Sequence, residues 1–131
     1  MFRYKHEAEF SRALCSFLRK KGWFVQRIES GTTGRGVPDI YAVNPAHMPV
    51  WLELKRIHTY VRYGSTITVP WREGQQAWLT NITKLGQYAY TLACCDNLIL
   101  RIPHDKTYPE NRISLGLPGV KAYFMLPDLI T

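Results

Sequence analysis

The chain has 131 residues, of which 46% are hydrophobic and 21% charged, so it can bury one apolar core and we expect a single domain over residues 1–131. Its 17 lysines and arginines exceed its 10 acidic residues, and the net charge of +7 favours a polyanionic partner such as nucleic acid, although many basic proteins have none. Arg12, Arg19 and Lys20 interrupt the N-terminal segment, so we expect no signal peptide, no membrane contact and a cytoplasmic protein.

The first predicted element is an amphipathic helix over residues 6–20, followed by Gly22 as a stop signal. Its apolar side chains recur with the helical period, at Phe10, Ala13, Leu14, Phe17 and Leu18. Three strands are then predicted, at residues 23–28, 37–43 and 50–56, because these runs combine β-favouring residues with alternating polarity. Residues 30–36 are rich in glycine and are expected to form a loop.

Residues 57–70 fit neither pattern well, although the run from Thr66 to Val69 favours a strand. A second helix is predicted from Trp71 onward and ends at Gly86. Its apolar face carries Trp78, Leu79, Ile82 and Leu85. Further strands are predicted at 88–94 and 98–102, and one more at 121–126 in the tail.

The predicted order α-β-β-β-α-β indicates an α/β fold in which helices flank a mixed central sheet. We expect its core to span about residues 6–102 and residues 103–131 to form a C-terminal extension. Cys94 and Cys95 are neighbours, which disfavours a disulfide between them, and Cys15 lies in a helical apolar pattern. All three cysteines are therefore expected to be reduced and mostly buried.

Three polar residues, Asp39, Glu53 and Lys55, stand out in the central predicted strands. Side chains alternate along a strand, so Glu53 and Lys55 share one face about 7 Å apart, while Leu52 and Leu54 share the other. If the strands that contain Asp39 and Glu53 pair through the short connection between them, the two carboxylates lie opposite each other.

Two converging carboxylates repel each other unless a cation or a shared proton relieves them. A hard divalent cation such as Mg²⁺ prefers oxygen ligands of this kind, lowers the pKa of its bound water and neutralises charge that builds up on a phosphate. A neighbouring lysine can contact phosphate or act on the attacking water. The alternative is a group of salt bridges on a solvated strand face, which is common for an acid-x-Lys pattern alone.

Pro38-Asp39 together with Glu53-Leu54-Lys55 resembles the signature of the PD-(D/E)XK nuclease superfamily, with its restriction-endonuclease-like α-β-β-β-α-β core. More narrowly, the chain is similar to the VRR-NUC branch, a set of small nucleases related to Holliday junction resolvases. Four stretches carry this likeness: Glu7-x-Glu9, Gly22-Trp23, Gly36-x-Pro-Asp39 and Arg72-x-x-Gln-x-x-Trp78. The insertion at 57–70 and Gly74 in the first turn of the second helix depart from the family pattern.

This resemblance implies hydrolysis of phosphodiester bonds in DNA with Mg²⁺ or Mn²⁺ as cofactor. It implies that Asp39 and Glu53 are metal ligands and that Lys55 is the catalytic lysine. Glu7 would be an accessory acid of the metal site, and Gln75 a catalytic-site residue on the second helix.

The helical period separates Glu7 from Glu9. Glu7 falls roughly 50° from the centre of the first apolar stripe and Glu9 roughly 110°, so we expect Glu7 to approach the Asp39–Glu53 pair and Glu9 to point toward solvent. Gln75 likewise falls on the apolar face of its helix. Both Glu7 and Gln75 are near helix ends, where simple contact with water is the alternative explanation. His6 also falls near the first stripe and is expected to be partly buried and not a ligand.

Basic residues flank the proposed site and could hold phosphates on either side of the cleaved bond: Arg35, Arg56, His58, Arg62 and Arg72. The alternative is a basic rim that is merely solvated. A nucleotide-binding loop, a zinc site and a redox pair of cysteines are not supported, because the GxxxxGK[ST] pattern, clustered Cys and His ligands, and CxxC spacing are absent from the sequence.

The sequence therefore predicts a divalent-metal-dependent endonuclease that acts on DNA, with branched or structured DNA as the expected substrate. A resolvase of this kind is expected to be a homodimer, because a four-way junction presents two related strands. Two alternatives stay open: a non-catalytic module that binds nucleic acid, and a nuclease that acts on RNA or on single strands.

Overall fold

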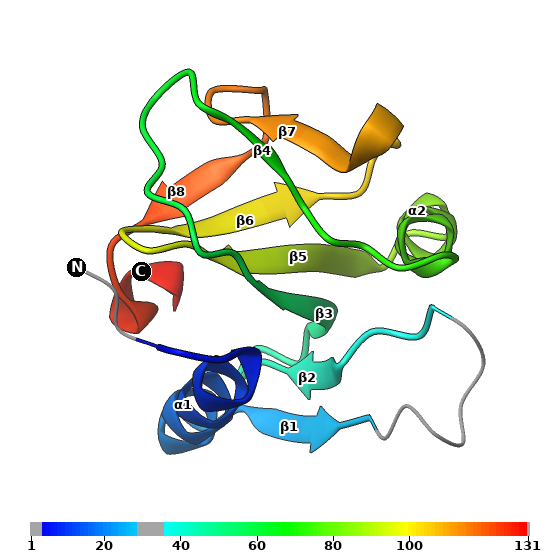
Figure 1. Ribbon diagram of the computed structural model, residues 1–131. Helices are drawn as coiled ribbons and strands as arrows, with labels where there is room; N and C mark the ends of the chain where they lie inside the picture. The colour runs from blue at the N-terminus through cyan, green and yellow to red at the C-terminus, as the bar shows by residue number, and fades with distance from the viewer. Residues whose placement is uncertain (1–3, 29–35, 131) are drawn as a thin grey trace.

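A six-stranded mixed sheet forms the centre of the computed structural model, which describes residues 4–28 and 36–130 (Figure 1). The strand order is β1-β2-β3-β5-β6-β8, in which β3 and β5 run parallel and the other neighbours run antiparallel. The strands are β1 (Phe24–Arg27), β2 (Ile40–Val43), β3 (Pro49–Arg56), β5 (Tyr88–Cys94), β6 (Ile99–Pro103) and β8 (Lys121–Tyr123).

The helix α1 (Glu7–Lys20) packs on one face of this sheet. Acidic residues in its first turn and basic residues in its last turn suit the helix dipole, and Gly22, with a φ of 87°, lets the chain turn toward β1. The 3₁₀ helix η2 (Leu126–Ile130) lies against the same side. Side chains of α1, of η2 and of the facing side of the strands form a first core. This core includes Phe10, Leu14, Leu18, Ile40, Ala42, Leu52, Leu54 and Leu126.

The opposite face is covered by α2 (Gln75–Lys84), which packs against β5, and by a small sheet of β4 (Thr66–Thr68) and β7 (Arg112–Ser114). A second core fills this side, and it includes Val61, Ile67, Val69, Trp71, Leu100, Ile102, Tyr108 and Ile113. With a mixed sheet between two helices, the predicted α/β fold class is confirmed.

The pairing of β4 with β7 joins the two regions that the sequence left without a clear role. Ile67 of the 57–70 segment lies opposite Ile113 of the C-terminal extension, and both are buried. The extension also supplies η1 (Pro109–Asn111) and β8 at the edge of the main sheet. β4 falls within the run from Thr66 to Val69 that favours a strand, whereas β7 has only three residues, too few for an alternating pattern to reveal it.

The second helix begins later than predicted. It starts at Gln75 and not at Trp71, because Gly74 adopts a left-handed φ of 88° at the N-cap and Trp71 is buried in the second core. Leu85 was expected on the apolar face but is 78% exposed, since the helix ends at Lys84 and Leu85 is already its C-cap.

Other predicted bounds shift by a few residues. The strand predicted at 37–43 begins only at Ile40, and the one predicted at 121–126 ends at Tyr123. The loop predicted at 30–36 lies outside the described residues except for Gly36. His6 is exposed at the N-cap of α1, so its predicted burial is wrong, because the helix starts only after it.

The cysteine prediction is confirmed, since Cys15, Cys94 and Cys95 are buried thiols and form no disulfide within the described residues. Within residues 4–28 and 36–130, no helix has the length and apolar character needed to cross a membrane.

Candidate active site

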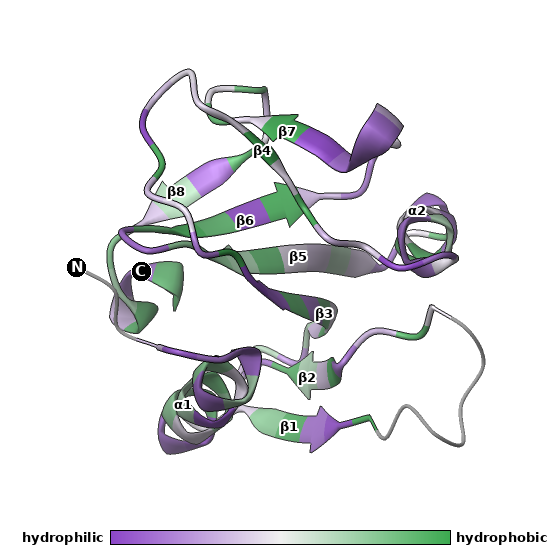
Figure 2. Cartoon of the chain, viewed as in Figure 1, coloured by the Kyte–Doolittle hydropathy of each residue, from purple (hydrophilic) through white to green (hydrophobic). Residues whose placement is uncertain are grey.

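The strand β3 presents two charged side chains on the face that it shares with α2. Leu52 and Leu54 pack into the first core, whereas Glu53 and Lys55 lie on the other face and are only 1% and 5% exposed. Figure 2 shows hydrophilic bands along β3 within a largely hydrophobic sheet. Charged groups buried to this extent need partners, because removal from water disfavours the charged form.

Asp39 lies just before β2 and beside β3. In the pairing of these strands Ile40 is opposite Leu52, and continuing the register by one residue places Asp39 opposite Glu53. The backbone N–H of Leu54 donates a 2.8 Å hydrogen bond to Oδ2 of Asp39. The carbonyl of Asp39 accepts another of 2.8 Å from the N–H of Ile28. Main-chain groups on both sides therefore hold Asp39 in place.

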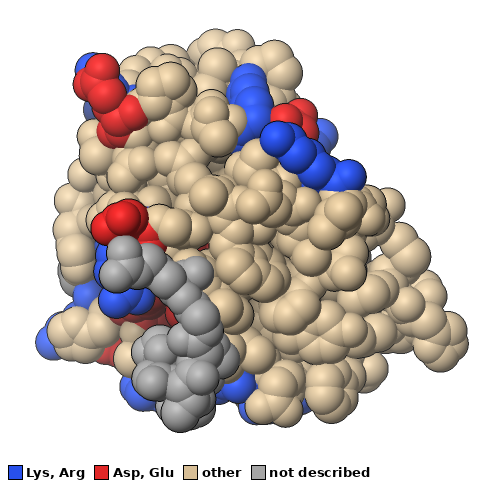
Figure 3. All heavy atoms as spheres, turned by 90° about the vertical axis from the view of Figure 1, so that its right-hand side faces the viewer, with Lys and Arg blue, Asp and Glu red and all other residues tan. Residues whose placement is uncertain are grey.

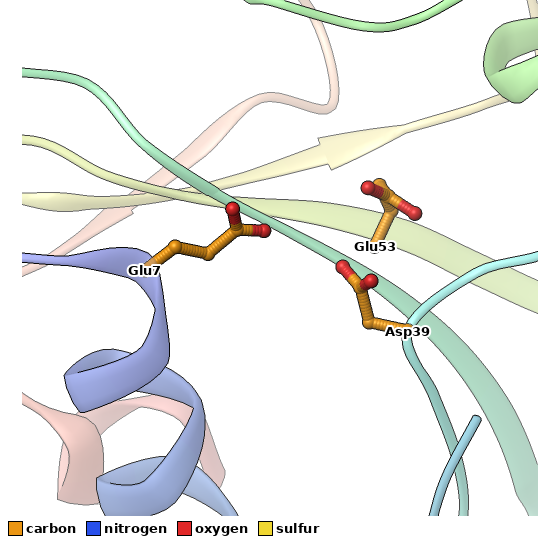
Figure 4. A group of neighbouring side chains, drawn as sticks. All are labelled: Glu7, Asp39 and Glu53. Carbon is orange, nitrogen blue, oxygen red and sulfur yellow. The ribbon is translucent and has the colours of Figure 1, made fainter. Parts of the chain in front are cut away.

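Glu7 reaches the same place from the first turn of α1. One carboxylate oxygen from each of Glu7, Asp39 and Glu53 lies within 4.8 Å of the others, and Figure 4 shows the three side chains converging from separate elements. Glu9 is not part of this group, as the helical period predicted. The exposure of these two residues differs from the prediction that Glu9 points toward solvent. Glu7 is the exposed residue of the two, and Glu9 is partly buried.

Burial and repulsion act together on these carboxyl groups. Burial first, and the Asp39 carboxylate second, raise the pKa of Glu53 to about 8, while Lys55 works in the opposite direction. Burial and then Asp39 also raise the pKa of Glu7, against the lowering influence of Lys55 and Arg72. Without a bound cation, the cluster of carboxyl groups therefore retains a proton near neutral pH.

Lys55 and Gln75 contact the same oxygen of Glu53. The Nζ of Lys55 is 3.3 Å from Oε2 of Glu53, and Nε2 of Gln75 donates a 3.1 Å hydrogen bond to it. The Oε1 of Gln75 accepts a 2.8 Å bond from the backbone N–H of Arg72, which fixes the amide with its NH₂ group toward Glu53. Oε1 of Glu53, by contrast, is buried and contacts no donor among the described residues.

A divalent cation would satisfy that oxygen. Buried polar atoms normally have a partner, and Glu7 and Asp39 supply further carboxylate oxygens beside Glu53. An all-oxygen donor set is the kind that Mg²⁺ and Mn²⁺ prefer. The residues present therefore fit such an ion, whereas a simple group of salt bridges would leave Oε1 of Glu53 unexplained.

A buried chain of hydrogen bonds supports the site from β5. Thr91 lies opposite Glu53 in the parallel pairing of β3 with β5. Its Oγ1 accepts a 2.9 Å bond from the indole N–H of Trp71 and lies 2.8 Å from Nε2 of His104. Burial lowers the pKa of His104 to about 4, so its ring is neutral at pH 7. Trp71 is thus tied to the sheet just before the segment that carries Gln75.

A hollow of about 250 Å³ lies beside Glu7 and Asp39. Two exposed arginines, Arg27 and Arg72, contribute to its walls. Arg72 was expected near the site, and the structure places it there. Arg27 was not expected, because its position at the end of β1 follows from the pairing of β1 with β2 and not from any local pattern.

Arg56 is not available to bind phosphate, so its predicted role is wrong. Its side chain is only 3% exposed, and its guanidinium donates to the carboxylate of Asp96 over 2.8 Å and to three backbone carbonyls, those of Tyr4, Ile57 and Cys94. The reason is the alternation of β3: Arg56 follows Lys55 and therefore points to the opposite face of the sheet.

The remaining basic residues are more distant or undescribed. His58 and Arg62 are exposed in the segment after β3, and Arg62 lies over the ring of Tyr60. Neither of them lines the hollow beside Asp39 in the described part of the chain. Arg35 lies outside the described residues.

Sequence reasoning missed the residues that hold the site in place. Trp71, Thr91 and His104 are far apart in the sequence, so no spacing rule connects them. One signal was available, since alternation in the strand 88–94 places Thr91 on the same inward face as Ala89 and Ala93. A polar residue at such a position needs a buried hydrogen-bond partner.

Comparison with known proteins supports the fold. No family model and no curated protein matches the sequence. Among solved structures, the chain is similar to Hjc, a Holliday junction resolvase from the archaeal hyperthermophile Archaeoglobus fulgidus, with a TM-score of 0.58 and 19% sequence identity. The match covers 82% of this chain and 87% of that chain. The chain thus has an α/β fold similar to that of this resolvase.

Proposed function

We propose that the chain is a divalent-metal-dependent endonuclease that hydrolyses phosphodiester bonds in DNA. The convergence of Glu7, Asp39 and Glu53 on one point, with one buried oxygen of Glu53 lacking a donor among the described residues, carries this proposal. Mg²⁺ is the proposed ion, with Mn²⁺ as a substitute. Membership of the PD-(D/E)XK superfamily, and of its VRR-NUC branch, is part of the same proposal.

Each residue has a separate task in this proposal. Glu7, Asp39 and Glu53 hold the cation, which when bound supplies an activated water and neutralises charge on the cleaved phosphate. Lys55 is held by Glu53, with 3.3 Å between Nζ and Oε2, on the face where it can orient water or contact the phosphate. Gln75 binds the same oxygen from α2 and so fixes the direction of the Glu53 carboxylate.

DNA is the proposed substrate because the chain is strongly basic and arginines border the hollow. Arg27 and Arg72 lie beside Glu7 and Asp39, where they can contact backbone phosphates without reading the base sequence. The exposed His58 and Arg62, and Arg35, remain candidates for contacts further along the strand. Figure 3 shows charged side chains around the margins of the face that carries α2 and a broad uncharged area between them.

Branched or structured DNA is the proposed form of the substrate. It is favoured by the likeness in fold to a protein described as a Holliday junction resolvase. A four-way junction has two related strands to cut, so a homodimer related by a two-fold axis is proposed as the active assembly.

The test is cleavage of labelled four-way junctions, flaps, duplexes and single strands with Mg²⁺, Mn²⁺ or a chelator. We expect cleavage only with metal, and none by Asp39→Asn or Glu53→Gln, both of which should still bind DNA in chelator. Full activity in chelator would overturn the metal site. Tight binding with no cleavage under any metal condition would instead favour a non-catalytic binding module.

A further inference from the structure

Four aromatic side chains form a continuous row beside the candidate active site. The ring centroids are 6.5 Å apart for Phe24 and Tyr41, 4.7 Å for Tyr41 and Trp51, and 5.0 Å for Trp51 and Trp78. The row crosses β1, β2 and β3 and ends on α2. Neighbouring rings are inclined by 52° to 68°, so they do not cover one another face to face.

The row lies on the side of the sheet away from α1 and is open to solvent. Along β1 and β2 the side chains alternate, with Val25 and Ala42 buried in the first core and Phe24 and Tyr41 on the other side. Phe24 is 56% exposed, and the other three rings are partly exposed. The indole N–H of Trp51 donates a 2.7 Å hydrogen bond to the side chain of Gln87, which fixes the orientation of that ring.

Contact between the rings accounts for their mutual packing, because cross-strand aromatic pairs stabilise a sheet. It does not account for their position. Two apolar cores are available to this chain, yet this set of large rings lies at the surface. An exposed cluster of this kind indicates a binding surface.

The row is continuous with the proposed catalytic groups. Trp51 precedes Glu53 by two residues on the same face of β3, a separation of about 7 Å. Trp78 follows Gln75 by about one turn of α2. A strand whose phosphate lies at the carboxylate cluster therefore brings its neighbouring bases to the rings.

We propose that Phe24, Tyr41, Trp51 and Trp78 form a stacking platform for unpaired bases of the DNA strand that passes the active site. The substrate would then carry unpaired nucleotides next to the cleaved bond, as at a flap, a bulge or a single-stranded gap. This inference rests on the proposed nuclease function. Exposed aromatic faces bind bases without regard to sequence, because every base has a π-face.

The structures of duplex and single-stranded DNA indicate which of the two can bind the aromatic row. In an intact duplex the base faces are covered by neighbouring pairs, and only unpaired bases can stack on protein rings. The phosphates of the same strand find positive charge at Arg27 and Arg72, which border the hollow beside Asp39. A single strand thus meets an apolar surface for its bases and a basic surface for its backbone.

Binding is measured with a labelled oligothymidylate and with a duplex of equal length, in chelator, so that cleavage plays no part. The double variant Phe24→Ala/Tyr41→Ala is compared with Phe124→Ala, which removes another exposed phenylalanine, 69% exposed, near the C-terminus. The double variant should bind the single strand at least about fivefold more weakly and the duplex within about twofold of the wild type. Unchanged single-strand binding by a folded double variant would overturn the platform.

Tryptophan fluorescence provides a second test, which does not require the variant Phe24→Ala/Tyr41→Ala to fold. Oligothymidylate should quench the emission of the wild-type protein, and the double variant Trp51→Phe/Trp78→Phe should lose most of the quenching. Trp23→Phe is the control, because Trp23 packs against the first core on the other side of the sheet. Quenching that persists in Trp51→Phe/Trp78→Phe would overturn the proposal.

Two further outcomes separate this inference from the proposed function. If the wild-type protein shows no metal-dependent cleavage but loses single-strand binding in the double variant, the nuclease proposal fails and the platform stands. If the double variant turns a dimer into a monomer with single-strand binding unchanged, the row is a contact between two copies of the chain and the platform is refuted.

Discussion

Gly36 lies against Gly74 so closely that a Cβ atom on Gly36 would collide with the carbonyl of Gly74. Gly36 is three residues before Asp39, and Gly74 directly precedes Gln75. This contact holds the segment that carries Asp39, a proposed metal ligand, against the start of α2. That helix start carries Gln75, which binds the Glu53 carboxylate. Both glycines have a positive φ, 86° and 88°, which other residues rarely adopt.

Gly36→Ala should therefore disrupt the site beyond the ordinary cost of a positive φ, which is about 1 kcal/mol. Gly64→Ala is the matched control, because Gly64 has the same φ of 86° and no atom within 4 Å of an added Cβ. We expect a larger loss of stability in urea unfolding, and at least tenfold lower cleavage, for Gly36→Ala than for Gly64→Ala. Equal effects of the two substitutions would show that the Gly36–Gly74 contact has no role.

The metal-free protein should lose stability as the pH rises. The pKa of Glu53 is about 8 in the fold against an ordinary 4.5, so the folded state holds this proton more tightly than the unfolded state. The stabilisation is complete below about pH 4.5 and is lost as the pH passes through about 8. We expect Tm in chelator to fall between about pH 4.5 and about pH 8, and Glu53→Gln to flatten that fall. A wild-type profile as flat as that of Glu53→Gln would contradict this.

Glu7 and Glu9 should differ sharply in their effect on cleavage. The Glu7 carboxylate belongs to the group with Asp39 and Glu53, and the Glu9 carboxylate does not. We expect Glu7→Gln to lower the rate of cleavage at least about tenfold with the fold intact, and Glu9→Gln to be nearly silent. The measurement is single-turnover cleavage, with circular dichroism to check folding. A larger effect at Glu9 would mean that Glu7 is wrongly assigned to the site.

Lys55→Ala should lose most of the cleavage rate while cation binding persists, because an ammonium group is not a ligand for a hard cation. Lys55→Arg should also be slow, since a planar guanidinium is neither a compact donor nor a base. Metal affinity is measured by calorimetry and the rate by single-turnover cleavage. Full activity of Lys55→Arg would reassign Lys55 to plain contact with phosphate.

Substitution of Arg72 should weaken DNA binding, whereas substitution of Arg56 should lower the stability of the fold. Arg72 is exposed at the hollow, so Arg72→Gln should reduce the slope of log binding constant against log salt by about one and leave stability nearly unchanged. Arg56 is buried with Asp96, so Arg56→Gln should lower the free energy of unfolding by about 3 kcal/mol. A salt slope that does not change in Arg72→Gln would remove Arg72 from the DNA contact surface.

Features with a local signal were predictable from the sequence. The strand predicted at 88–94 matches β5 residue for residue, and α1 begins one residue from its predicted start. The alternation of β3 placed Glu53 and Lys55 on one face because that strand is long enough, at eight residues, for the period to be clear. The same periodic reasoning, applied to α1, chose Glu7 over Glu9 for the carboxylate group.

Features that depend on distant parts of the chain were not predictable in this way. The pairing of β4 with β7 joins three-residue strands that are far apart in the sequence. The hydrogen bonds from Trp71 through Thr91 to His104 likewise link the segment before α2, the strand β5 and the segment after β6. The aromatic row escaped notice for the same reason, since its four rings come from four elements. Arg56 was misplaced because closeness in sequence to Lys55 was taken for closeness in space.

Because β4 pairs with β7, which comes much later in the chain, the site can be completed only in stages during synthesis. The proposed metal ligands and Lys55 all leave the ribosome within the first 56 residues. The second core that anchors Trp71, and through it the start of α2, needs residues that emerge much later: His104, Tyr108 and Ile113. A nascent chain therefore carries its acidic groups before Gln75 can be held against Glu53, and the proposed site is complete only after residues 104–113 have joined the fold.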